Sequence, residues 1–290
     1  MVLAALCWST AGILIRLVDA DPWAIVAWRS AIMAIAVTIG ILSVQMRRTG
    51  SLSAGIGAAV TRFRDMGWAG VLSASLLATT FGLFVLAITR TSVGSTLVIM
   101  AATPFVVALL GWAFLGERPS RRTWMAMTVV LAGIAIMFGD GLGSGAWSGN
   151  LLALVVTVTF GVNTLVVRRH REVDMVPAVA LGGFLSAIAA APLAESLAVD
   201  AGSFAALALL GIVQLSIGLA LFVAAVKRLT AADVSLIGTL ETVLGPVWAW
   251  LGVGERPEPA VLVGGALVLG TLMLYTRSTR IGPAVTPAEA

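Results

Sequence analysis

The sequence carries one carboxylate, Glu241, in the middle of a long apolar stretch. If that stretch crosses a membrane, an unpaired charge at this depth costs about 2.5 to 3.5 kcal/mol on insertion scales. The group must therefore be neutral, paired or in a water-filled cavity. Glu241 either faces a cavity, where it binds a substrate amino group or a coupling proton, or forms an ion pair with a buried cation, for which Arg29 is the first candidate.

Three further charged residues lie inside or at the ends of apolar stretches. Arg29 follows the start of the second stretch, where a long side chain can reach the interface. We expect a structural clamp there, with binding of a substrate carboxylate as the alternative. Glu117 and Glu255 each end an apolar stretch beside an arginine, Arg118 or Arg256. We expect these two glutamates to form helix-end polar clusters that hold loops in place.

Hydroxyl, amide and aromatic groups within other apolar stretches are candidates for the wall of a substrate cavity. An asparagine in a lipid-bounded helix needs a hydrogen-bond partner, which is either a neighbouring helix or a substrate. Pro104 and Pro246 each remove a backbone hydrogen bond and can bend a helix, so we predict hinges there. Together with Glu241, the candidate wall residues are Trp8, Ser9, Thr10, Thr79, Thr80, Phe81, Thr103, Phe160 and Asn163.

Residues for covalent, metal or nucleotide chemistry are sparse. His170 is the single histidine and lies between arginines, and Cys7 is the single cysteine, so neither a zinc cluster nor a disulfide framework is expected. The sequence has no G-x-x-x-x-G-K-[ST] motif for ATP, and the alternating glycines of 139–145 follow an apolar stretch rather than a strand. We expect no catalytic residue, no metal and no cofactor.

The composition indicates a protein that resides in a lipid bilayer. Hydrophobic residues make up 59% of the chain and charged residues 11%, with a mean hydropathy of +1.04. A soluble globule of 290 residues needs more polar surface than this. The net charge of +4 could suggest nucleic acid as a partner, but no water-soluble domain offers a basic face for it.

Ten apolar stretches of roughly 17 to 24 residues are each long enough to cross about 30 Å of hydrocarbon as a helix. They are too long and too continuous for the strands of a barrel. We therefore predict an all-α integral membrane protein with ten transmembrane helices. The predicted spans are 2–18, 23–45, 66–89, 93–115, 122–140, 148–168, 176–195, 204–226, 231–253 and 260–276.

The basic residues between the spans predict the orientation. If the N terminus is cytoplasmic, most of the 18 lysines and arginines fall in segments on the cytoplasmic side, whereas Arg16, Arg90 and Arg256 lie outside. Cytoplasmic loops are enriched in such residues. We predict cytoplasmic N and C termini and a location in the bacterial inner membrane.

A four-residue motif occurs twice in the sequence. Gly-Glu-Arg-Pro stands at 116–119 and again at 254–257, and the same offset pairs Trp112 with Trp250. Each half then holds five spans, and because five is odd, the halves enter the membrane from opposite sides as inverted repeats. The predicted organisation is a first repeat over 1–140, a flexible linker over 141–147, a second repeat over 148–276 and a cytoplasmic tail over 277–290.

These features together resemble the EamA-type branch of the drug/metabolite transporter superfamily. The resemblance covers essentially the whole chain. It rests on the two five-span halves, on Trp8-Ser9-Thr10, on Arg29 and on the proline-containing spans that end in the repeated motif. One departure is that the second half has Glu241-Thr242 where the first half has Thr103-Pro104.

The resemblance implies a secondary transporter that exports small metabolites, above all aromatic and other neutral amino acids. Transport would proceed by alternating access through a central cavity between the halves. The alternative is a proton-coupled efflux pump for cationic drugs or other metabolites, in which Glu241 exchanges protons for cations. The expected partners are a small-molecule substrate and the lipid bilayer, without nucleic acid, and both a monomer and a homodimer stay open.

Overall fold

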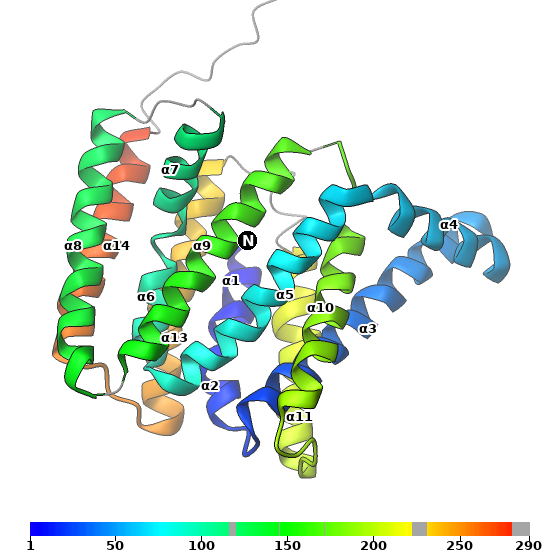
Figure 1. Cartoon of the computed structure of the whole chain (residues 1–290), viewed down its shortest axis with the longest axis horizontal. Coiled ribbons are helices and arrows are strands. Elements are labelled where there is room, and N and C mark those ends of the chain that lie inside the picture. The colour runs from blue at the N-terminus through cyan, green and yellow to red at the C-terminus, as the bar shows by residue number, and fades with distance from the viewer. Residues whose placement is uncertain (116–119, 145, 171, 222–230, 280–290) are drawn as a thin grey trace, which may run out of the picture.

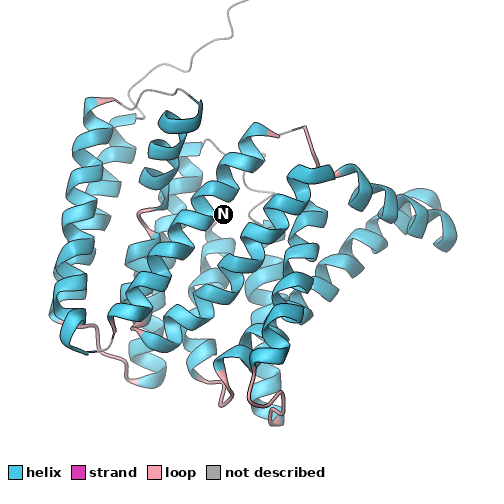
Figure 2. Cartoon of the chain, in the orientation of Figure 1, coloured by secondary structure: helices cyan, strands magenta, loops and turns pink. Residues whose placement is uncertain are grey.

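The computed structural model describes the chain except residues 116–119, 145, 171, 222–230 and 280–290 (Figure 1). Within the described residues, every element of secondary structure is a helix (Figure 2). The predicted all-α class is therefore confirmed for this part of the chain.

The first half of the chain forms a series of helices interrupted by short breaks. The bounds are α1 (Val2–Ser9), α2 (Ala11–Arg16), α3 (Pro22–Thr49), α4 (Leu52–Asp65), α5 (Gly67–Arg90), α6 (Val93–Met100), α7 (Thr103–Leu115) and α8 (Arg121–Ser144). The second half continues with the same kind of element, and it includes one short 3-10 helix, η1, and one π-helix, η2. The bounds are α9 (Trp147–Arg169), α10 (Val176–Ala190), η1 (Ala191–Leu193), α11 (Ala201–Leu209), η2 (Leu210–Ile217), α13 (Ala231–Val253) and α14 (Pro259–Thr279).

Among the described residues, six helical segments are long and apolar enough to cross a membrane. They are Pro22–Thr49, Gly67–Arg90, Val93–Phe114, Trp147–Val167, Val176–Leu193 and Ala201–Leu221. Shorter apolar helices coincide with the other predicted spans, namely Val2–Arg16, Trp124–Gly133, Leu240–Val253 and Pro259–Thr271. Within the described residues, each predicted span thus corresponds to a helix or to consecutive helices, while the number of ten membrane crossings stays a prediction.

The segment between the second and third predicted spans is helical, although it contains no predicted span. Helix α4 follows the end of α3 and extends away from the rest of the bundle (Figure 1). Its exposed apolar residues Leu52, Ile56 and Val60 share one face, as is typical of helices that lie in the membrane interface. Arg62 on α4 forms an ion pair with Asp174, just before α10.

Helices of the two halves pack in matching pairs. α3 lies along α10, α6 contacts α13 and α8 lies along α14, so the second, fourth and fifth predicted spans each contact their counterparts. The third span contacts the sixth through α5 and α9, and the first span contacts the eighth through α1 and η2. These two contacts are equivalent when the first and second halves are exchanged. Two related five-span units give this kind of packing.

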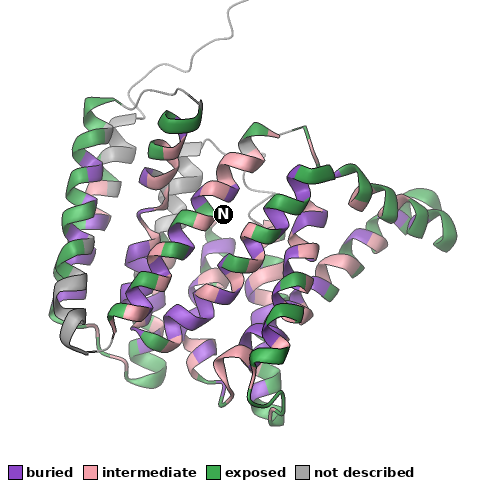
Figure 3. Ribbon diagram, viewed as in Figure 1, coloured by how far each residue is buried: buried purple, intermediate pink, exposed green. Residues whose placement is uncertain are grey.

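The core lies between helices from both halves. Ile25 of α3, Phe84 of α5 and Leu207 of α11 belong to one buried apolar cluster. Buried positions concentrate in the middle of the bundle, whereas the outer faces are exposed (Figure 3). Large apolar side chains such as Trp68 and Leu274 are exposed, as expected of a surface that faces lipid.

Candidate functional site

Two opposite ends of the bundle serve as landmarks for the site. We call the end at which α2 stops and α3 begins the α2 end, and the opposite end, where α4 lies, the α4 end (Figure 1). The polar groups described below lie between these ends or at the α2 end.

A break in the first predicted span brings a hydroxyl into the interior. The span is interrupted at Thr10, whose Oγ1 donates to the carbonyl of Cys7 at 2.7 Å. The hydroxyl of Ser9 donates to the carbonyl of Leu6 and accepts a hydrogen bond from Trp248 Nε1 at 3.0 Å. Because Ser9 belongs to the first half and Trp248 to the second, a polar contact joins the two halves inside the bundle.

Trp8 lies beside Gly218, which directly follows the π-helix η2. A Cβ atom on Gly218 would lie 2.5 Å from Trp8 Nε1, so only glycine leaves room for the indole. Trp8 and Ser9 therefore contact two different helical segments of the second half, one at the end of η2 and one on α13.

Arg29 is the most unusual charge in the structure. Only 2% of its surface is exposed, so it does not reach the membrane interface. Its Nη2 donates to Oε1 of Gln214 at 3.3 Å, and its guanidinium carbon lies 5.3 Å from the centre of the Phe84 ring. Nε and Nη1 have no hydrogen-bond partner among the described residues. An uncompensated buried charge costs about 3 to 5 kcal/mol, and the ion pair with Glu241 suggested by the sequence is not found among the described side chains.

Gln214 lies in η2, a π-helix of 8 residues within the eighth predicted span. Such helices are rare and are frequently found at functional sites. Close approach of η2 to α3 holds the two side chains together, because a Cβ on Gly211 would lie 3.1 Å from the carbonyl oxygen of Arg29. The guanidinium is thus held between α3 and α5 of the first half and η2 of the second.

Glu255 forms a fully paired cluster at the α2 end. Its Oε2 accepts from Arg16 Nε at 2.9 Å, and its Oε1 accepts from the backbone N–H of Val93 at 2.6 Å. Arg16 Nη2 also donates to the carbonyl of Thr91 at 2.7 Å, and the Thr91 hydroxyl donates to Asn150 Oδ1 at 2.8 Å. The predicted helix-end cluster thus joins the segment after α13 to α2, α6 and α9.

The two predicted hinge prolines occupy different backbone settings. The fourth predicted span is interrupted between Met100 and Thr103, directly before Pro104, and Thr103 Oγ1 donates to the carbonyl of Met100 at 2.6 Å. Pro246 lies inside the continuous helix α13, near Gly94 of α6. The corresponding spans of the two halves therefore differ in continuity.

Two candidate wall residues pair across the contact between α5 and α9. The Ser73 hydroxyl donates to Asn163 Oδ1 at 2.7 Å, and the hydroxyls of Thr80 and Thr159 lie 3.1 Å apart. A neighbouring helix therefore supplies a partner for the Asn163 amide and for the Thr80 hydroxyl. The remaining candidates are less buried: Phe81 and Thr103 are half-buried, while Thr79 and Phe160 are exposed.

Glu241 lies on α13, about two turns before Trp248 and on nearly the same face of the helix. It is half-buried, and no described residue forms an ion pair with it. Because Trp248 points to Ser9 on α1, the Glu241 side chain lies on the face of α13 that is directed to the first half. Glu117, the counterpart of Glu255 in the first repeat, is outside the described residues.

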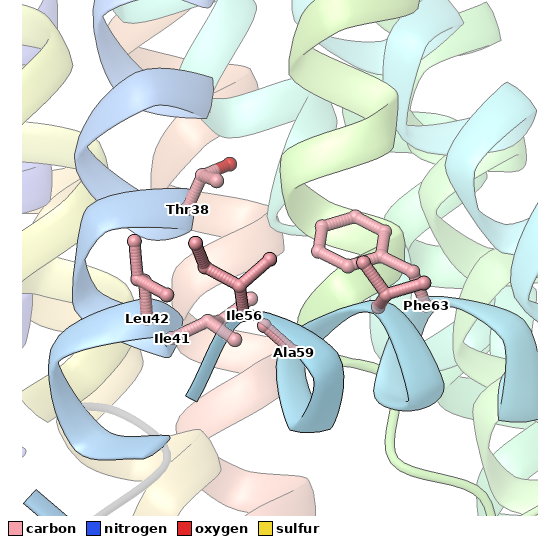
Figure 4. Close-up of a pocket in the computed structure, with 7 residues that line it drawn as sticks. Thr38, Ile41, Leu42, Ile56, Ala59 and Phe63 are labelled. Carbon is pink, nitrogen blue, oxygen red and sulfur yellow. The ribbon is translucent and has the colours of Figure 1, made fainter. Parts of the chain in front are cut away.

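The described structure contains two hollows between helices. One, of about 200 Å³, lies between α3 and α4, and Figure 4 shows its apolar lining with the single hydroxyl of Thr38. That hydroxyl already donates to the carbonyl of Ala34. The other, of about 250 Å³, lies between α3, α5 and α10 and includes Thr79 and Ser186. The second hollow includes the candidate wall residue Thr79, but neither hollow is lined by Arg29 or Glu241.

Several residues in these contacts are absent from the candidates chosen on sequence, and three of them show what signal was available. Gln214 is a polar residue deep inside an apolar stretch, which is the signal that singled out Asn163. Arg16 ends the first span, and its partner Glu255 is 239 positions away in the chain, a separation at which no spacing rule applies. Trp248 provides a ring N–H inside a span, where an indole needs an acceptor.

Comparison with known proteins gives two findings. The model of the EamA-like transporter family matches residues 1–139 and 147–277. A solved structure described only as "Crystal structure of protein" is similar with a TM-score of 0.67 and 21% sequence identity, over 96% of this chain and 96% of that one. At this identity the similarity shows the fold alone. No curated protein matches the chain.

Proposed function

The chain belongs to the EamA-like transporter family, and from this premise we propose that it exports small metabolites, with aromatic and other neutral amino acids as its substrates. Family membership makes it a multi-pass membrane transporter. The substrate class, the direction of transport and the mechanism are our proposal.

The contact of Ser9 with Trp248 is the observation that carries the proposal. It places a hydroxyl and an indole N–H from different halves in the interior of an apolar bundle. Transporters built from two repeats commonly bind substrate at the junction of the repeats, near the bilayer midplane. We propose that this junction opens to one side of the membrane at a time.

The residues chosen from the sequence supply the proposed cavity wall. Trp8, Ser9 and Thr10 lie at the break in the first span, and Glu241 lies on the face of α13 directed to the first half. The proposed wall is completed by Thr79, Thr80, Phe81, Thr103, Phe160 and Asn163. A wall of aromatic and apolar surface with a few hydroxyls and one carboxylate suits a small zwitterion with an apolar side chain.

The proposed movement uses the two proline-containing spans. The interruption before Pro104 is already present, whereas the bend at Pro246 would form during the cycle. We assign the α4 end to the cytoplasm and the α2 end to the outside, because Arg47 and Arg48 of α3 and the two arginines of α4, Arg62 and Arg64, lie at the α4 end. On this assignment Glu255 seals the outer end, and both termini are cytoplasmic in a bacterial inner membrane.

A proton-coupled pump for cationic drugs is the second candidate. The half-burial of Glu241 and its lack of an ion pair among the described residues favour it, because a membrane carboxylate can hold either a proton or a cation. A buried Arg29 disfavours it, since a second positive charge nearby would repel a cationic drug.

Transport by the purified protein tests the proposal. Proteoliposomes without an ion gradient would be given radiolabelled Trp, Phe, Thr, Met, Ala, Lys or Asp, with a methylated dication as the drug-like probe. Saturable movement of the neutral amino acids is the expected result. Movement of the dication alone, and only against a proton gradient, would replace the proposal with the drug pump.

A matched pair of glycine variants locates the pathway. Gly218→Leu crowds Trp8, so we expect it to abolish transport. A Cβ atom on Gly270 of α14 meets no atom within 4 Å, so Gly270→Leu should leave transport at the wild-type rate. The size-exclusion profile of each variant shows whether it is folded. Equal transport rates for both folded variants would show that the substrate pathway does not pass the junction of Trp8 and η2.

A further inference from the structure

Arg29 presents hydrogen-bond donors to the protein interior that no described residue accepts. A guanidinium carries five N–H donors in a fixed plane. One nitrogen, Nη2, is engaged by Gln214, whereas Nε and Nη1 are enclosed and have no partner among the described residues. The side chain is 2% exposed, so bulk water does not satisfy these donors.

The surroundings of Arg29 only partly compensate its charge. The guanidinium lies over the Phe84 ring, with 5.3 Å between the guanidinium carbon and the ring centre. Such a contact stabilises a cation weakly compared with a carboxylate in hydrogen-bonding distance. Gln214 offers a neutral oxygen at 3.3 Å, which is long for a hydrogen bond. Among the described residues, the site therefore lacks one negative charge.

A purely structural role does not explain this arrangement. A clamp needs an acceptor for its donors, as Arg16 has in Glu255 and in the carbonyl of Thr91. Arg29 has the burial of a core residue, and the part of the chain that the structure describes does not supply it with the acceptors of a clamp. A methionine or leucine of similar volume would fill the space between α3, α5 and η2 without the penalty of a buried charge.

We infer that Arg29 is the receptor for the carboxylate of the transported substrate. The inference rests on the proposed function and specifies it further. The two donors without a described partner, Nε and Nη1, are on different edges of the guanidinium. A carboxylate that enters when the junction of the halves opens can therefore bond to one of these edges beside the bond to Gln214. A single guanidinium balances a single negative charge, so the ligand is a monocarboxylate with an apolar side chain rather than a dianionic phosphate ester.

Gln214 is a positioning residue in this account. It holds the guanidinium in place through Nη2, and it is carried by η2 of the second half, whereas Arg29 is carried by α3 of the first. Movement of one half relative to the other changes the distance between these side chains. Binding of a carboxylate to Arg29 is thereby coupled to the relative position of the halves.

Comparison of an acid with its amide tests the inference. The probes are L-phenylalanine and L-phenylalaninamide, which share an amino group and a side chain and differ in the carboxylate. Each is titrated against wild-type protein and an Arg29→Met variant in detergent, with the shift in unfolding temperature as the readout. The same compounds compete with labelled L-phenylalanine in proteoliposomes.

The wild-type protein should bind the acid about 10- to 100-fold more tightly than the amide, as expected for hydrogen bonds to a charged group. Arg29→Met should bind both equally and weakly, and Arg29→Lys should recover only part of the preference because it lacks the planar fork. Arg90→Gln is the matched control: this exposed arginine ends α5, and its variant should keep the wild-type preference. An unchanged preference in Arg29→Met overturns the inference.

Gln214→Glu separates a receptor from a structural role. The new carboxylate would lie beside Nη2 of Arg29 and supply the missing charge from within the protein. A receptor account predicts a higher unfolding temperature together with at least a tenfold loss of affinity for the acid, while affinity for the amide changes little. A higher unfolding temperature with unchanged affinity for the acid contradicts it.

The outcomes distinguish this inference from the proposed function. If the wild-type protein transports neutral amino acids and Arg29→Met keeps the preference for the acid, the inference fails and the function stands. If the wild-type protein transports only the dication, the function fails. The unfolding measurement then still decides about Arg29, because protection by the acid and not the amide supports a carboxylate site, and equal protection or none excludes it.

Discussion

Arg16 and Arg29 are both arginines of the first half that contact the second half, yet their surroundings are opposite. Arg16 lies at the α2 end, half-buried, and donates to the Glu255 carboxylate and to the carbonyl of Thr91. Arg29 lies in the interior and donates to one neutral oxygen, with two nitrogens left without a described partner. The more buried cation is the less satisfied one.

The difference indicates two separate tasks. A charge that holds helices together must be paired in the structure in which it does so, and Glu255 meets this condition with both carboxylate oxygens. A charge that receives a ligand must leave donors available at a cost to stability. Substitutions should therefore affect stability at Arg16 and ligand affinity at Arg29.

Arg29→Met should show the largest effect on function. Affinity for a monocarboxylate substrate falls about 10- to 100-fold because hydrogen bonds to a charged group are lost. The unfolding temperature should stay at the wild-type value or rise, since an incompletely paired buried charge is removed. Thermal unfolding in detergent, with and without L-phenylalanine, checks both effects. A large drop in the unfolding temperature of the ligand-free variant would show that Arg29 holds the helices together, as Arg16 does.

Glu255→Ala should show the largest effect on stability. It leaves Arg16 and the backbone N–H of Val93 without their carboxylate partner, and we expect a loss of about 2 kcal/mol. Arg16→Met in the same background should add little, because the two side chains form one pair. Unfolding of the single and double variants in detergent measures this coupling. Additive losses would show that the two residues act independently.

Trp248→Phe tests the neutral contact between the halves. It keeps most of the ring and removes the N–H that donates to Ser9, so we expect a loss of about 1 kcal/mol. The preference for the acid over the amide should be retained, because Arg29 is unchanged. Ser9→Ala should have a similar effect on stability. Loss of the acid preference in Trp248→Phe would mean that Trp248, and not Arg29 alone, orients the carboxylate.

Asp200 should show the smallest effect, because its charge lies outside the proposed membrane-spanning segments. Hydrogen bonds from the Ser203 hydroxyl and from the backbone N–H groups of Ser203 and Gly202 lower the pKa of this carboxyl below its ordinary value. A lowered pKa stabilises the folded protein above the ordinary value of 3.8, and this stabilisation is lost as the pH falls through the folded pKa. Asp200→Asn should reduce the dependence of the free energy of unfolding on pH, measured as the pH is lowered from 6 into the acid range. The same pH dependence in the wild-type protein and the variant would show that Asp200 does not contribute to stability.

Local rules predicted the helices well because every backbone group in lipid must be bonded within its own segment. Apolar length therefore locates helices such as α5 and α9 directly. The same rule does not locate α4, whose arginines and apolar residues follow the pattern of an interfacial helix rather than a span. Proline alone did not determine continuity either, because the span of Pro104 is interrupted and that of Pro246 is not.

The partners of the candidate residues depend on tertiary contacts that a sequence does not contain. In the sequence, an ion pair with Arg29 is one of two alternatives for Glu241, whereas in the structure η2 packs against α3 and supplies Gln214 as the partner of Arg29. Asn163 was predicted to need a partner, and helix α5 supplies one in Ser73. Depth in the bundle likewise depends on tilt and neighbours, so the full burial of Arg29 could not be deduced from its place near the start of a span.

The most direct measurement is the ratio of inhibition constants for L-phenylalaninamide and L-phenylalanine, obtained in proteoliposomes from wild-type and Arg29→Lys protein. The account predicts a ratio of about 10 to 100 for the wild-type protein and a ratio much closer to one for the variant. The same large ratio in both proteins would contradict it, because the carboxylate would then be recognised somewhere other than Arg29.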